Sequence, residues 1–93
     1  MQIRCHINPT TGLPHTYDHF VSENEVEDIL SRPLQDIRGR DDSRIAIGQS
    51  AEGGYLKVIY VPDPTPDSVF VITAYELGPK AKRAIRRKRR KKQ

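Results

Sequence analysis

Residues 44–75 read RIAIGQSAEGGYLKVIYVPDPTPDSVFVITAY, and they are the most strand-like part of the chain. Glycines at positions 53 and 54 are typical of a hairpin connection, and the proline-rich residues 62–67 form a second, stiffer connection. The segments between these connections are rich in β-branched and aromatic residues, as central strands of a sheet are. The sequence therefore predicts an antiparallel meander of three strands: 44–49, 55–61 and 68–75.

The first residues of the chain predict a further hairpin. Residues 3–7 alternate apolar and polar side chains, as a half-buried strand does. Residues 8–12 (NPTTG) have the composition of a turn, and residues 15–17 are expected to return as a second short strand. We therefore expect an N-terminal hairpin beside the meander.

A helix is indicated between the hairpin and the meander. Ser22 and Glu25 have the spacing of a capping box, and the valines that flank this box have the spacing of a hydrophobic staple. Pro33 ends the helix near residue 31 or 32. Three apolar residues at helical spacing give the helix one apolar stripe: Val26, Ile29 and Leu30.

The remaining segments complete an α+β fold with a small antiparallel sheet. Residues 35–43 are polar and are predicted to form a loop. Residues 1–78 form a single small domain, which at this size buries only about 60% of the surface of its chain and is marginally stable. Residues 79–93 form a basic C-terminal helix or tail, and Pro79 suits the first turn of such a helix.

Alternation along the three strands assigns their side chains to two faces of the sheet. The set that contains Leu56, Val58 and Phe70 is bulkier and is expected to lie under the helix. The other face is either a second small core under the N-terminal hairpin or a ligand surface for a polyanion. It is expected to collect a polar set and an apolar set: Arg44, Lys57, Thr73 and Tyr75 with Ile59, Val61, Val69 and Val71.

The charge of the chain is divided between its body and its tail. All 12 acidic residues precede Pro79, whereas ten of the 16 lysines and arginines follow it. The body thus has a net charge of −6 and the tail +10. The tail is either a nucleic-acid contact, a solubilising segment or an arm that pairs with the acidic helix. The residues expected to bind nucleic acid are Lys82, Arg83, Arg86, Arg87, Arg89 and Arg90.

Several classes of protein are excluded by composition. The single cysteine, Cys5, cannot form an internal disulfide, so a reducing compartment, the cytoplasm, is expected. No apolar stretch approaches the length of a membrane span, and no membrane partner is expected. His15 and His19 are spaced like ligands on a helix, but the residues between them are not helical in pattern and no cysteine pair accompanies them, so no metal site is predicted.

Residues 15–77 resemble the BrnT-type toxins of the RelE superfamily. The resemblance rests on the order and spacing of five pieces of sequence. They are HFVS at 19–22 before the helix, RIAIGQ at 44–49, a glycine pair, LKVIYV at 56–61 and VFVITAYEL at 69–77.

The resemblance implies a RelE-like fold and the function of a bacterial type II toxin. Such a toxin is an endoribonuclease that needs no metal or other cofactor, cuts RNA or mRNA, either free or bound to the ribosome, arrests translation and is held inactive by a co-encoded antitoxin. The resemblance further implies catalytic roles for Arg44, Lys57, Tyr75 and His19, of which His19 takes the place of the family's histidine before the helix. Tyr75 stands where the family has an arginine.

Two other functions fit the same residues. In the first, the protein is a non-catalytic RNA- or ribosome-binding module, in which the tail supplies affinity and the sheet stacks bases. Alternatively, it is an interaction protein whose tail binds an acidic partner.

Overall fold

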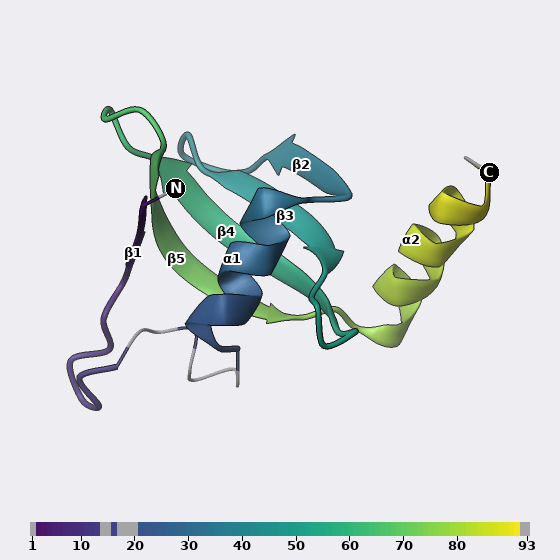
Figure 1. Cartoon of the computed structure of the whole chain (residues 1–93), viewed down its shortest axis with the longest axis horizontal. Helices are drawn as coiled ribbons and strands as arrows, with labels where there is room; N and C mark the ends of the chain where they lie inside the picture. Colours follow the sequence, from purple (N-terminus) through teal and green to yellow (C-terminus); the bar gives the residue numbers. More distant parts are fainter. Residues whose placement is uncertain (1, 14–15, 17–20, 92–93) are drawn as a thin grey trace.

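Three apolar segments form the centre of a five-stranded sheet in the computed structural model (Figure 1). They pair antiparallel in chain order, as predicted: β3 (Arg44–Gln49), β4 (Tyr55–Pro62) and β5 (Ser68–Glu76). The structure describes residues 2–13, 16 and 21–91, and the side chains of the last helix as far as residue 87. With two helices and a mixed sheet in the order β1-β5-β4-β3-β2, the chain has an α+β fold.

The first strand pairs with the last strand of the meander. β1 (Gln2–Cys5) lies parallel to β5, with Ile3 beside Val69 and Cys5 beside Val71. This parallel pairing with β5 was not predicted, because alternation identifies a strand but not its neighbour in the sheet. Residues 8–12 do form a turn, closed by a hydrogen bond from the Asn8 N–H to the Leu13 carbonyl. The expected return strand falls on residues 15–17, of which only Thr16 is described.

An edge strand occupies part of the predicted loop. β2 (Gln35–Arg38) pairs antiparallel with β3, and only residues 39–43 connect the two strands as a turn. The prediction of a loop over residues 35–43 is wrong for the first four residues. An edge strand exposes one backbone edge and tolerates charged side chains, so its composition resembles that of a loop.

The first helix begins as its sequence predicts. In α1 (Glu23–Ser31) the Ser22 side chain accepts a hydrogen bond from the Glu25 N–H, and the Glu25 carboxylate accepts one from the Ser22 N–H. This capping box satisfies two backbone donors that the first turn leaves unpaired. Val26 and Ile29 are fully buried on the face that packs against the sheet.

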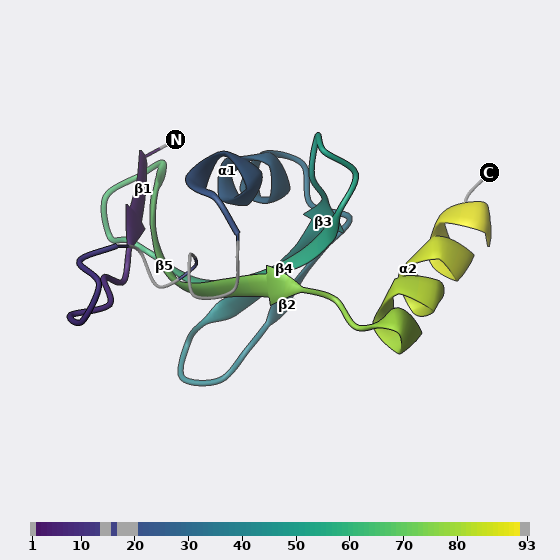
Figure 2. The same cartoon turned by 90° about the horizontal axis from the view of Figure 1, so that it is seen from below.

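The hydrophobic core lies between α1 and one face of the sheet (Figure 2). Each central strand contributes alternate residues to it, as a sheet with one covered face requires. Its buried members are Val21, Val26, Ile29, Ala46, Leu56, Val58, Tyr60, Val69, Val71 and Ala74.

A β-bulge between β4 and β5 changes which residues face the core. Thr73 pairs with Ile59 and Val71 pairs with Tyr60, so Ile72 is an extra residue on β5. The bulge reverses the alternation, and Val71 lies buried beneath α1 rather than on the open face where simple alternation places it. Val69, also predicted on the open face, is buried in the same core for the same reason. Phe70, predicted under the helix, lies opposite Arg4 on the open face, with its ring 5.2 Å from the guanidinium carbon.

The second helix stands at the end of the sheet. α2 (Pro79–Lys91) follows β5 after two residues and extends away from the body (Figures 1 and 2). Its apolar contact with the body is a small cluster in which Ile85 packs against Tyr55 and Leu77. Among residues 2–13, 16 and 21–91 no helix combines the length and apolar character that crossing a membrane requires.

An ion pair holds β1 against the connection between β4 and β5. Both Asp63 carboxylate oxygens accept from the Arg4 guanidinium, at 3.0 and 2.6 Å, and the Ser68 hydroxyl donates to the same carboxylate at 2.6 Å. These hydrogen bonds lower the pKa of Asp63 below its ordinary value of 3.8.

Replacement of the central helix residue tests the core. We predict that Ile29→Ala lowers the free energy of unfolding by about 2–5 kcal/mol, because it leaves a cavity between α1 and the sheet. Ile37→Ala is the matched control, since Ile37 is 49% exposed on the edge strand and its loss should cost less than about 1 kcal/mol. Urea unfolding measures both, and equal losses would contradict the assigned core.

The Asp63 ion pair predicts a dependence of stability on pH. The pKa of Asp63 is lower in the folded state than in the unfolded state. The ion pair therefore stabilises the fold fully at pH values above the unfolded-state pKa, and this stabilisation is lost as the pH falls through the folded-state pKa. Asp63→Asn should therefore destabilise the protein at pH 7, and the difference from wild type should shrink below about pH 4. Glu52→Gln, at an exposed turn position, is the control. A difference for Asp63→Asn that is constant from pH 7 to 3 would rule out the ion pair as its cause.

Candidate nucleic-acid interface

Two of the predicted site residues are direct neighbours on the open face of the sheet. Lys57 on β4 pairs with Tyr75 on β5, and the Lys57 ammonium nitrogen lies 5.6 Å from the centre of the Tyr75 ring. Both residues are partly exposed. A cation over an aromatic ring is attracted by the negative face of the ring, which restrains Lys57 without occupying its hydrogen-bond donors. The structure thus brings together an ammonium group and a phenol.

Arg44 does not belong to this pair. In the register of β3 with β4, Arg44 pairs with Tyr60, and Ile47 pairs with Lys57. Arg44 therefore lies on the same face of the sheet as Tyr60, which is the face that α1 covers. The expectation that Arg44 lies beside Lys57 and Tyr75 is therefore wrong. Alternation within β3 and within β4 is correct, but the pairing between the two strands sets which two sets of residues share a face.

Arg44 is held in an ion pair on its own face. Its Nε donates to Asp36 Oδ1 at 2.9 Å and its Nη2 donates to the Asp36 carbonyl at 3.2 Å. The Tyr60 hydroxyl donates to the second oxygen of the same carboxylate at 2.6 Å. Asp36 raises the pKa of Arg44, and burial is the main cause of the raised pKa of Tyr60. The Asp36 carboxylate is thus occupied from two sides.

The histidines add little to the described site. His19, the fourth predicted catalytic residue, lies outside the described residues, as does His15. His6 follows β1, and its ring meets the Phe70 ring edge to face at 6.5 Å between centres. Within the described part of the chain, no three His, Cys, Asp or Glu side chains are grouped closely enough to hold a metal ion.

The predicted nucleic-acid-binding residues lie on α2. Lys82 donates to the Glu76 carboxylate at 2.6 Å, while Arg83 and Arg87 are exposed. Arg89 and Arg90 lie in the last turns of the helix, where only the backbone is described. Nine lysines and arginines fall within this helix, and no acidic residue does. Alignment of so many cations on one short helix makes it strongly attractive to a polyanion.

Arg86 joins α2 to the sheet. Its guanidinium carbon lies 5.6 Å from the centre of the Tyr55 ring, which is buried next to Ile85. Tyr55 and Lys57 are two residues apart on β4 and therefore face the same side of the sheet. We call the surface formed by Lys57, Tyr75, Arg86 and α2 the basic corner. The pairing of Arg86 with Tyr55 had no signal in the sequence, because it depends on how α2 packs.

Comparison of the chain with protein-family models, with curated proteins and with solved structures found no match.

Proposed function

We propose that the protein acts on RNA at the basic corner, as the toxin of a type II toxin–antitoxin pair that cuts RNA without a metal ion. The observation that carries the proposal is the position of the Lys57–Tyr75 pair on β4 and β5, since β5 leads directly into the cationic helix α2. The sequence resemblance of residues 15–77 to BrnT-type toxins supports the same role. A co-encoded antitoxin is the proposed protein partner, and the cytoplasm the proposed compartment.

Electrostatics favours the basic corner as the place where RNA binds. The body outside α2 is acidic, with 12 carboxylates against six lysines and arginines, so a polyanion is repelled by the body and attracted to α2. Each phosphate neutralised on single-stranded RNA releases bound counterions and lowers the logarithm of affinity by about 0.7 per decade of salt. Binding through α2 should therefore be strongly dependent on salt.

The Lys57–Tyr75 pair has the groups that metal-independent RNA cleavage requires. The substrate's 2′-oxygen bonds to the adjacent phosphorus, the bond from phosphorus to the 5′-oxygen breaks, and the products are a 2′,3′-cyclic phosphate and a 5′-hydroxyl. The Lys57 ammonium stabilises the extra negative charge of the pentacoordinate phosphorus. Tyr75 gives a proton to the departing 5′-oxygen, and the 2′-hydroxyl proton passes to water. Arg44 has no part in this step, because it lies on the other face.

A second candidate function is a non-catalytic RNA- or ribosome-binding module. The observation that favours it is the register of β3 with β4, which places Arg44, one of the two sheet cations expected beside Tyr75, on the other face. Tyr75 then stacks a base instead of transferring a proton, and α2 supplies affinity.

Cleavage distinguishes the two functions. We predict that the purified full-length chain cuts RNA in the presence of EDTA and leaves 2′,3′-cyclic phosphate ends. Lys57→Ala and Tyr75→Phe should each slow the reaction by about 10²-fold or more, because each removes a group used in the transition state. Arg32→Ala, an exposed cation at the end of α1, is the control and should cleave normally. RNA that stays intact with the wild-type protein would favour the binding module.

The role of α2 is tested by binding to 2′-O-methyl RNA, which cannot be cleaved by this chemistry. We predict that the double variant Arg83→Gln, Arg87→Gln binds more weakly. If each arginine neutralises one phosphate, the slope of log affinity against log salt concentration should be less steep by about 1.4. Fluorescence anisotropy between 50 and 200 mM salt measures both quantities. The matched control, Arg32→Gln with Arg40→Gln, removes the same charge elsewhere. An equal change in both double variants would show that only net charge matters.

A further inference from the structure

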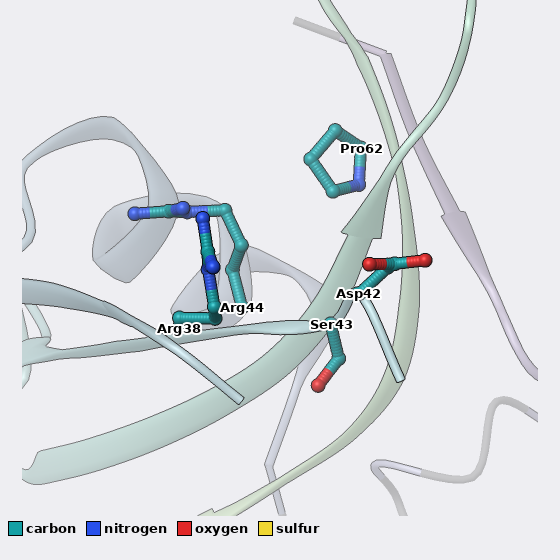
Figure 3. A pocket seen from close by; sticks show the side chains of 5 residues that line it. All are labelled: Arg38, Asp42, Ser43, Arg44 and Pro62. Carbon is teal, nitrogen blue, oxygen red and sulfur yellow. The ribbon is translucent and has the colours of Figure 1, made fainter. Parts of the chain in front are cut away.

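A pocket of about 290 Å³ lies at the corner of the sheet where β2 ends, β3 begins and β4 ends. Figure 3 shows Arg38 and Arg44 side by side on one side of this pocket, with Asp42 and Pro62 on the other. Ser43 completes the lining. The pocket lies at the opposite end of β4 from Tyr55, which contacts α2, about 20 Å away at the usual rise per residue.

The turn between β2 and β3 fixes the wall of the pocket. The Gly39 N–H donates to the Ser43 carbonyl, and the Ser43 N–H donates to the Arg40 carbonyl, both at 2.9 Å. Asp41 and Asp42 take the left-handed conformation, with φ of 52° and 64°. A side chain at Gly39 would meet the Ser43 hydroxyl at 2.4 Å, so the turn is closely packed. Arg38 and Arg44 are therefore anchored at the two ends of a well-defined turn.

The two arginines face each other across the strands, and this has an energetic cost. Arg38 and Arg44 are directly paired in the register of β2 and β3, where like charges repel. Asp36 cannot neutralise both, because its carboxylate already accepts from Arg44 and Tyr60. The Arg38 side chain makes no hydrogen bond to any residue that the structure describes. An anion between the two guanidinium groups would remove the repulsion.

Arg44 is also held in place before any ligand binds. Its contacts with the Asp36 side chain and backbone fix one edge of the guanidinium group, and the buried Tyr60 fixes Asp36. Donors that are already oriented lose little conformational entropy when a ligand binds. Arg38 adds a second planar set of donors, of the kind that binds phosphate with two parallel hydrogen bonds.

We propose that Arg38 and Arg44 form a binding site for a phosphate group. The tetrahedral oxygens of phosphate can accept hydrogen bonds from both guanidinium groups at once. Asp42 lies on the far side of the pocket from the arginines, so its carboxylate leaves the space between them free (Figure 3). The site is separate from the basic corner and does not depend on RNA cleavage.

Titration of the full-length protein with inorganic phosphate tests the site. Amide chemical shifts of Ser43 and Arg44 should move with a dissociation constant on the order of 1 mM, as expected for so small a ligand. Arg38→Gln should weaken binding at least tenfold, and Arg38→Lys should weaken it less, because lysine keeps the charge but lacks the planar donors. Arg40→Gln is the matched control, since Arg40 lies in the same turn but does not line the pocket, and it should change binding less than twofold.

A second measurement identifies the source of the phosphate. Short 2′-O-methyl RNA with a 5′-phosphate is compared with the same RNA carrying a 5′-hydroxyl, in wild type and Arg38→Gln. A preference for the 5′-phosphate that disappears in Arg38→Gln assigns the site to an RNA end, whereas equal binding assigns it to free phosphate. The proposal is overturned if phosphate moves no shifts at Ser43 and Arg44, or if Arg38→Gln and Arg40→Gln weaken binding equally. Failure of RNA binding at α2 leaves the phosphate titration unaffected.

Discussion

The pairing of β4 with β5, with its one extra residue at Ile72, determines which side chains build the core and which build the surface. Ala74 faces α1 on one side of the bulge, and Val69 and Val71 face it on the other. Without the bulge, the two valines would point away from the helix, and a domain of this size has few other apolar side chains to replace them. The same irregularity brings Phe70 onto the open face with Tyr75, so the register sets the composition of both faces.

Local signals predicted α1 and the three central strands, and non-local contacts account for what they missed. The capping box at Ser22 and the apolar segments of β3 to β5 carry their information within a few residues. The pairing of β1 and the formation of β2 depend on which edges of the sheet are free. That information is not contained in any short segment of the sequence. For the candidate site, Lys57 and Tyr75 were placed together correctly, since they occupy adjacent strands on one side of the bulge. The position of Arg44 was wrong because it depends on the register between β3 and β4.

The cations of the body and those of α2 are in different situations. Arg4 is held by Asp63 in the connection between β4 and β5, and Arg44 by Asp36 on β2, so the charge of each is neutralised where it lies. In α2 the one ion pair among the described side chains is that of Lys82 with Glu76. Acidic residues outnumber basic ones twofold before Pro79, so the body keeps a net negative charge while α2 carries a large excess of positive charge. A polyanion is therefore attracted mainly towards α2.

The two kinds of cation also differ in what a phosphate must displace. Arg44 makes one hydrogen bond to the Asp36 carboxylate and one to the Asp36 carbonyl, so a ligand can use only the donors that Asp36 leaves free. Lys57 lies over the Tyr75 ring, an interaction worth about 0.5–1 kcal/mol at an exposed position, and none of its three donors is used by the ring. Lys57 is therefore the cation that can follow the charge on a reacting phosphate, whereas Arg44 is suited to hold an anion in a fixed place. The sheet thus carries a movable cation on one face and a rigid one on the other.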